Sequence, residues 1–246
     1  MIYYAPEQLN RQHKLIAGIT YASREKYNSS EYIEGLNFGE NTVTPLPVIK
    51  HNLEVLNHEI NHDGEFALAE QVHGADVAVI SDSGYYSGVD GLVTTTKNLV
   101  IAIKVADCGA VLLSDPANNI IAAVHAGWRG AAAGILPNAL DKIKKAGARP
   151  ANIICYISPC ISLQNFEIGE EVAEKFPSQF IDRSIGHKPH LNLKEFLRTQ
   201  LVDAGVAPSN IEIDSRCTVD NTSFYSHRRE RDKAGRMLAF IKQSPN

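Results

Sequence analysis

The stretch from Asn98 to Gly130 constrains the fold most, because it contains three short apolar runs that each end in polar residues. The runs are Leu99–Val105, Ala110–Leu113 and Ile120–Val124. Each is partly β-branched and bounded by turn residues, which is typical of a buried strand. If the three strands are neighbours in one sheet, the polar residues at their ends meet at one rim of that sheet.

Polar side chains with metal-binding or nucleophilic chemistry occupy this rim. Asp107 and Cys108 follow the first run, and His125 ends the third. A thiolate and an imidazole that reach a common point suit either a zinc site or a Cys/His nucleophile pair. The residues alone leave both possibilities open.

A third candidate ligand, His73, follows the apolar segment Phe66–Ala69. With Cys108 and His125 it completes a set of two imidazoles and one thiolate. Three protein ligands leave the fourth position for water or substrate, which is the pattern of catalytic zinc. The separations match no zinc-finger spacing, and each residue taken singly is more often structural than a ligand.

The composition of the chain limits the classes of function that it can have. The chain has 246 residues, of which 44% are hydrophobic and 21% charged, as expected for a globular protein. A net charge of −4 argues against a broad nucleic-acid surface. The sequence shows no signal peptide and no membrane-length apolar run, and its four cysteines form no CxxC pair. We therefore expect a cytoplasmic protein with reduced thiols and no membrane or nucleic-acid partner.

The remaining patterns predict helices between strands. Apolar residues recur at helical spacing over 47–60 and 136–143, and Asn192 precedes Glu195 as in a capping box. Pro137 either kinks the second helix or lies in its first turn. Because strict alternation of strand and helix is absent, we expect an α/β (α+β) fold with mixed sheet layers flanked by helices, in one domain over 1–246.

Five motifs together resemble the YfiH, or laccase-domain, family. They are QVHG, ADC, HAGWRG, SPCI and SFYSHRR, and they occur in order between about Leu36 and Ile241. Members of that family are also described as multifunctional purine nucleoside phosphorylases, formerly polyphenol oxidases. By position, the resemblance implies a YfiH-like fold and a metal, usually zinc, bound by His73, Cys108 and His125.

The resemblance also implies an activity and its residues. It predicts a zinc-dependent purine nucleoside phosphorylase with adenosine deaminase and methylthioadenosine phosphorylase activity, acting on purine nucleosides and phosphate as a monomer or weak homodimer. A metal with these ligands can lower the pKa of a bound water to about 7, which would serve deamination. Arginines suit the phosphate, and Asp107 suits proton transfer or orientation of a ligand. The predicted residues are Asp107 and Arg129 for catalysis, and Gln71, His227, Arg228 and Arg229 for substrate.

Other functions stay open at this point. The fold group includes Cys/His deamidases, in which Cys108 would attack and His125 would act as base, and the family has a proposed role in editing peptidoglycan precursors. Copper oxidation is less favoured, because multicopper oxidases use His-x-His pairs and this sequence has none. We interpret Asp90 as a turn residue that caps nearby backbone N–H groups. The divergent 21–35 loop and Ser158 depart from the family pattern, and their roles stay open.

Overall fold

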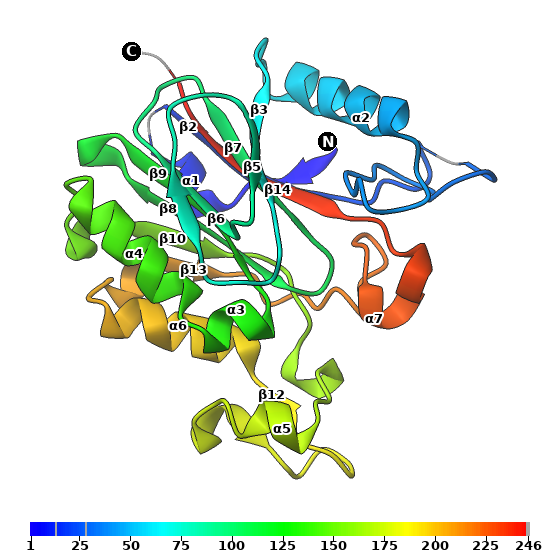
Figure 1. Cartoon of the computed structure of the whole chain (residues 1–246), viewed down its shortest axis with the longest axis vertical. Coiled ribbons are helices and arrows are strands. Elements are labelled where there is room, and N and C mark those ends of the chain that lie inside the picture. The colour runs from blue at the N-terminus through cyan, green and yellow to red at the C-terminus, as the bar shows by residue number, and fades with distance from the viewer. Residues whose placement is uncertain (13, 28, 245–246) are drawn as a thin grey trace.

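Two six-stranded sheets form the centre of the molecule, which we describe from a computed structural model over residues 1–12, 14–27 and 29–244. The first sheet has the order β1-β2-β14-β7-β3-β5 and mixes parallel with antiparallel pairs (Figure 1). Its strands are Tyr3–Tyr4 (β1), Leu15–Thr20 (β2), Met237–Gln243 (β14), Val100–Val105 (β7), Phe66–Glu70 (β3) and Gly84–Ser87 (β5).

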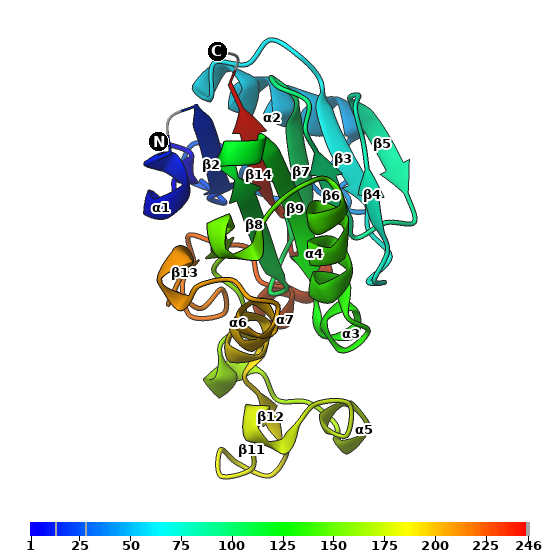
Figure 2. The same cartoon turned by 90° about the vertical axis from the view of Figure 1, so that its left-hand side faces the viewer.

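The second sheet has the order β13-β10-β8-β9-β6-β4 and is also mixed. A small two-stranded sheet, β11-β12, protrudes beyond the two large sheets together with α5 (Figure 2). These strands are Ile211–Ile213 (β13), Ile154–Ile157 (β10), Gly109–Asp115 (β8), Ile120–Ala126 (β9), Gly91–Thr94 (β6), Val77–Val79 (β4), Ile181–Asp182 (β11) and His190–Leu191 (β12).

Helices cover the outer faces of both large sheets, as Figures 1 and 2 show. Helix α2 lies on the first sheet, whereas α4 and α6 lie on the second. The α-helices are Glu7–Asn10 (α1), Leu46–Glu59 (α2), Trp128–Ala132 (α3), Ile135–Lys145 (α4), Glu170–Ala173 (α5), Leu193–Asp203 (α6) and His227–Glu230 (α7). The 3₁₀ helices are Pro116–Asn118, Pro150–Asn152, Leu163–Asn165, Ser178–Phe180, Pro208–Asn210 and Arg231–Lys233.

Side-chain alternation along the strands builds three apolar layers. In β9, Ile121 and Ala123 pack between the two sheets, whereas Ala122 and Val124 pack against the helices. Because successive side chains of a strand point to opposite faces, one strand contributes to two layers. The layer between the sheets contains residues from both of them. We propose on this ground that residues 1–246 form a single folding unit.

The predicted helices are confirmed with one clarification at Pro137. The chain makes a first short helix, α3, turns at Gly134 with a φ of +88°, and begins α4 at Ile135. Pro137 therefore lies in the first turn of α4, where its missing N–H has no intrahelical partner to lose. At α6, the Asn192 side chain accepts the N–H of Glu195 at 3.2 Å, as the capping pattern predicted.

The three central apolar runs form strands, but they do not share one sheet. β7 belongs to the first sheet, whereas β8 and β9 are paired in the second. The chain crosses between the sheets at residues 106–108. A strand that is buried on both faces carries no sequence signal for the sheet it joins, because both sheets offer the same apolar surroundings. Cys108 and His125 meet through the pairing of β8 with β9 alone.

Two further sequence expectations can be compared with the structure. His62 has a polar sequence setting that suggests exposure, but it is buried against Phe66, with ring centroids 6.0 Å apart. Within the residues that the structure describes, no helix is long and apolar enough to cross a membrane.

Candidate metal centre and cavity

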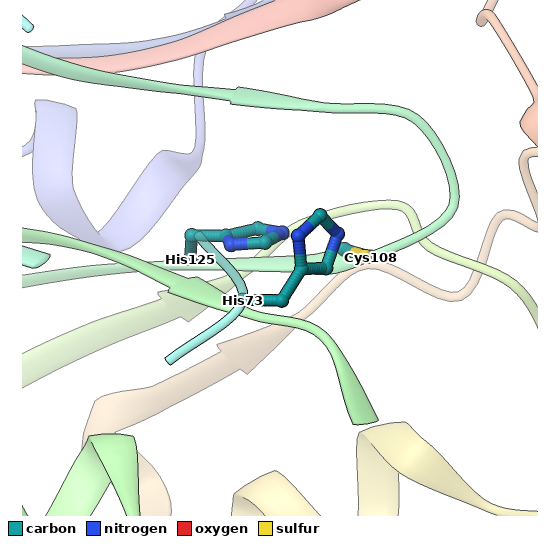
Figure 3. A group of neighbouring side chains, drawn as sticks. All are labelled: His73, Cys108 and His125. Carbon is teal, nitrogen blue, oxygen red and sulfur yellow. The ribbon is translucent and has the colours of Figure 1, made fainter. Parts of the chain in front are cut away.

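The structure brings His73, Cys108 and His125 together at one end of the two sheets (Figure 3). His73 comes from the loop after β3 in the first sheet. Cys108 directly precedes β8, and His125 lies near the end of β9 in the second sheet. The ladder pairs Gly109 with Ala126, which brings Cys108 beside His125. One potential ligand atom from each residue lies within 4.8 Å of the others.

These three residues fit a tetrahedral metal ion. In a tetrahedral zinc site with nitrogen and sulfur ligands, the donor atoms lie roughly 3.3–3.6 Å apart. The three side chains would therefore need to move only slightly closer together to bind the ion. Space for the ion comes from Gly127. A Cβ atom at Gly127 would lie 2.9 Å from the Cys108 sulfur, 3.5 Å from His73 Cδ2 and 3.6 Å from His125 Nε2. The absence of this side chain leaves a cradle between the donors.

Asp90 holds the candidate metal ligands in place. Its carboxylate is fully buried and accepts the backbone N–H groups of Val72, His73 and Gly74 at 3.1, 3.0 and 2.7 Å, respectively. The same carboxylate lies 2.6 Å from His125 Nδ1. A carboxylate at the second ring nitrogen of a ligand fixes the tautomer and leaves the other nitrogen for the metal. The predicted capping of backbone N–H groups is therefore confirmed, but those groups belong to the loop that carries His73.

The charges at the centre favour an ionised thiol. Burial raises the pKa of Cys108, but the adjacent His125 and His73 outweigh this effect and lower it to about 6. Burial lowers the pKa of His125, but Cys108 and Asp90 outweigh it and raise the pKa to about 9. At neutral pH Cys108 is thus a thiolate, which is the form that binds metals.

Two residues of the site adopt left-handed backbone conformations that are uncommon for residues other than glycine. His73 has a φ of +60° and Asp107 a φ of +77°. Such conformations persist only where surrounding contacts hold them, and they concentrate at functional sites. At His73 the hydrogen bonds to Asp90 supply these contacts, so the loop geometry and the ligand position are coupled.

The candidate metal ligands His73, Cys108 and His125 line a cavity of about 440 Å³. Its wall contains two aromatic side chains, Trp128 and Phe166, and four cationic ones. The cations are Lys104, Arg129, Arg228 and Arg236. Aromatic faces beside cationic groups can hold a planar base together with an anion.

Most of the predicted substrate and catalytic residues line this cavity, namely Gln71, Asp107, Arg129, His227 and Arg228. Gln71 exchanges two hydrogen bonds with the backbone of Lys104, at 2.7 and 2.8 Å. Asp107 accepts the hydroxyl of Thr218 at 2.5 Å and the N–H of Arg228 at 2.6 Å. These contacts place Asp107 at the start of α7, the helix that carries His227.

Arg229 lies outside the cavity wall. Its guanidinium donates to the carbonyl oxygens of Thr218, Val219 and Phe224 at 2.6–2.7 Å and also contacts Glu230. These bonds tie the turn before α7 to the helix itself. Arg229 therefore has a structural environment, because these partners are protein groups of the turn and of α7.

Two residues of the site, Lys104 and Arg236, and the contact of Asp90 with His125 were not predicted from the sequence. Lys104 had a detectable signal, because it is the one charged residue in the apolar run Leu99–Val105. A lysine inside such a run has to reach an edge or a counter-charge, and here its ammonium lies 2.9 Å from Glu40. Arg236 and the Asp90 contact depend on long-range pairing and left no local pattern.

Comparison with known proteins identifies the family. Residues 19–244 match the family described as "Multi-copper polyphenol oxidoreductase laccase". The chain belongs to this laccase-domain family. A relative from Deinococcus radiodurans, named purine nucleoside phosphorylase, is 33% identical over 210 residues, which cover 84% of this chain and 81% of the relative. Another laccase-domain relative, named purine nucleoside phosphorylase YlmD, from Bacillus subtilis, is 29% identical and covers 95% of this chain and 91% of its own.

Solved structures of the laccase-domain family share the fold. The crystal structure of the Bacillus licheniformis hypothetical protein YfiH superposes with a TM-score of 0.90 at 28% identity, and it covers 98% of this chain and 96% of its own. YlmD from Geobacillus stearothermophilus gives a TM-score of 0.88 at 29% identity, over 94% and 93% of the two chains. The YfiH-like fold expected from the motifs is thereby confirmed.

A methyl group at Gly127 is expected to weaken metal binding without unfolding the protein. The backbone there has a φ of −71° and a ψ of 166°, which alanine adopts freely, but its Cβ would occupy the space between the donors. We expect Gly127→Ala to reduce metal affinity at least roughly tenfold. Gly74→Ala is the matched control, because its Cβ would make only ordinary contacts at 3.4 and 3.5 Å. Titration with a chromogenic chelator measures both, and equal affinities would contradict the cradle.

Proposed function

We propose that this protein is a metal-dependent purine nucleoside phosphorylase. The observation that carries the proposal is the opening of the His73, Cys108 and His125 cluster into a cavity lined by cationic and aromatic side chains. The relatives named purine nucleoside phosphorylase support the substrate class. The substrates are then a purine nucleoside and inorganic phosphate.

In this reaction a phosphate oxygen forms a bond to C1′ of the ribose, and the N9–C1′ bond breaks. The electron pair of the broken bond goes to the purine, which takes up a proton and leaves as the free base. The other product is ribose 1-phosphate. Two demands follow for the protein: cationic groups must hold the phosphate, and the developing negative charge on the purine must be stabilised.

Side chains that line the cavity can meet both demands. Trp128 and Phe166 offer aromatic faces for the purine, and the arginines of the wall offer positive charge. Asp107 is better suited to positioning than to proton transfer, because both of its oxygens already accept hydrogen bonds, from Thr218 and Arg228. It holds the start of α7 against the cavity.

We propose zinc as the metal. Two imidazoles and one thiolate are ligands typical of zinc, and all three residues that would hold it line the cavity. When bound, zinc supplies Lewis-acid chemistry and stabilises negative charge that develops beside it. Copper is less favoured despite the family's description, because the sequence contains no His-x-His pair. Adenosine deamination and methylthioadenosine phosphorolysis are further activities that we propose for the same cavity.

A thiol hydrolase or deamidase is the second candidate, and one observation favours it. Cys108, His125 and Asp90 are arranged in the order thiolate, imidazole and carboxylate, with 2.6 Å between His125 Nδ1 and Asp90. The same order of groups activates nucleophiles in cysteine and serine hydrolases. This candidate gives His73 no necessary role, so His73 separates the two.

Product analysis tests the proposed function. The purified protein is incubated with adenosine, inosine, guanosine or methylthioadenosine, with and without inorganic phosphate. We expect the free base and the pentose 1-phosphate to form only when phosphate is present. Release of ammonia from adenosine reports deamination separately. Free pentose formed at the same rate without phosphate, or no turnover of any nucleoside, would overturn the proposal.

A further inference from the structure

Arg236 is held at the cavity by its own backbone and by the preceding turn. Its N–H donates to Asn37 Oδ1 at 2.8 Å, and its carbonyl accepts the N–H of Phe38 at 3.1 Å. One terminal guanidinium nitrogen donates to the carbonyl oxygens of Ala234 and Gly235 at 2.7 and 3.0 Å. The guanidinium is therefore fixed through one terminal nitrogen, and Arg236 lines the cavity.

The charge of Arg236 lacks a direct counter-ion. Among the residues that the structure describes, no carboxylate lies within ion-pair distance of it. Burial lowers the pKa of Arg236, whereas the charges of Cys108 and Asp107 raise it. A partly buried cation without a paired anion is costly, and such guanidinium groups commonly bind carboxylate or phosphate.

The other arginines of the wall are already engaged or exposed. The guanidinium of Arg228 donates to the carbonyl oxygens of Asn165 and Glu167, both at 3.0 Å. It thereby anchors the start of the protruding segment, and both of its terminal nitrogens already have carbonyl partners. The side chain of Arg129 is exposed and lies over the Trp128 ring, 4.4 Å from its centroid. Arg236 is thus the partly buried arginine of this wall whose Nε and Nη2 have no hydrogen-bond partner among the described residues.

The sheet register gives Arg236 a cationic neighbour. β14 pairs with β7 so that Leu238 lies opposite Lys104. Arg236 is two residues from Leu238 and therefore on the same face as Lys104. Diagonal neighbours of this kind lie about 7–8 Å apart at Cα, within reach of long side chains. Both Lys104 and Arg236 line the cavity.

One turn supports both cations. Gly39 packs against Arg236 so closely that a Cβ there would lie 2.7 Å from Arg236 Cγ. The next residue, Glu40, binds the Lys104 ammonium at 2.9 Å. Asn37, which is fully buried, accepts the N–H groups of Gly39 and Arg236 at 2.8 Å each. The segment Leu36–Gly39 and the following Glu40 thus support both side chains.

We propose that Arg236, assisted by Lys104, binds the phosphate co-substrate. The identity of the anion rests on the proposed function, whereas the subsite itself rests on the contacts of the two side chains. A guanidinium with unused N–H donors binds two oxygens of a tetrahedral anion at once, and the nearby ammonium adds positive charge. This assignment replaces Arg129, Arg228 and Arg229, the arginines that the sequence analysis selected for phosphate.

Direct phosphate binding tests the subsite. Isothermal titration calorimetry with inorganic phosphate is run on the metal-loaded wild type, Arg236→Met, Lys104→Met and the control Arg149→Met, which removes an exposed arginine outside the cavity. We expect Arg236→Met to weaken phosphate binding at least tenfold, Lys104→Met to weaken it less, and Arg149→Met to leave it unchanged. Zinc content and the KM for the nucleoside should stay within about twofold of wild type. Arg236→Lys retains the positive charge but cannot form a bidentate pair of hydrogen bonds, so it should bind phosphate more weakly than the wild type and more tightly than Arg236→Met.

The outcomes separate the subsite from the enzyme activity. Wild-type phosphate affinity in a folded Arg236→Met or Arg236→Lys protein, or no phosphate binding by wild type, would overturn the subsite. If the wild type binds phosphate and Arg236→Met does not, but the wild type cleaves no nucleoside, the subsite stands and the proposed function fails. If nucleoside is cleaved and only the KM for phosphate rises in the variant, both stand.

Discussion

Alanine in place of Cys108 is expected to abolish stoichiometric metal binding and to lower nucleoside turnover by more than about 100-fold. Loss of a residue that only supports a metal ligand costs at most about 100-fold in affinity or activity, and loss of the ligand itself should cost more. The thiolate is one of three donors, and two imidazoles alone hold zinc poorly in an open site. Elemental analysis of protein purified without chelator should find about one zinc per wild-type chain and little in the variant.

Cys155→Ala is the matched control for this experiment. Cys155 is buried in β10, and burial raises the pKa of its thiol, so it does not supply a thiolate near neutral pH. Its removal should change stability but leave the zinc content at the wild-type level. Full zinc occupancy in Cys108→Ala would show that this thiol is not a ligand.

Replacing Asp90 with alanine is expected to cost about 3–5 kcal/mol of unfolding free energy, as when one partner of a buried charged network is removed. The carboxylate accepts three backbone N–H groups and contacts His125, and all four would lose their partner. Chemical denaturation measures this change. Metal affinity should fall roughly 10–100-fold as well, because both His73 and His125 lose their support.

The ionisation of Asp90 adds a pH signature to this prediction. Burial raises the pKa of Asp90, but the hydrogen bonds from His125, Gly74 and Val72 outweigh it and leave the pKa below its ordinary value. The stabilisation is therefore complete above about pH 4 and is lost as the pH falls through the lower folded-state pKa. Asp141→Asn, which removes an exposed carboxylate, is the control and should cost little. A loss of under about 1 kcal/mol in Asp90→Ala, the value of an exposed pair, would contradict this role.

The local features of this fold could be predicted from the sequence. The apolar runs of β8 and β9 and the Asn192 cap of α6 follow from chemistry within a few residues, whereas the sequence left two positions open for Pro137. The proximity of Cys108 and His125 then follows from the pairing of β8 with β9, and no other part of the chain is needed to predict it.

Features that depend on distant pairing could not be predicted. The sequence does not show that β7 joins the other sheet, because it is buried on both faces. It does not show that Asp90 faces His125, which needs the β6–β9 register. The basic run after Ser226 looks like an anion site, yet the carbonyl oxygens around it engage Arg228 and Arg229. Arg236 and Lys104 line the same cavity because β14, which Arg236 directly precedes, pairs with β7.

The most direct test of the metal-dependent account measures zinc content and phosphate-dependent nucleoside turnover together in His73→Ala. The account predicts that both are lost, because His73 is a ligand and two remaining donors hold zinc poorly. A thiol hydrolase would need only Cys108 and His125. If His73→Ala stays active while Cys108→Ala is inactive, the metal mechanism is wrong, and Cys108 acts as a nucleophile instead.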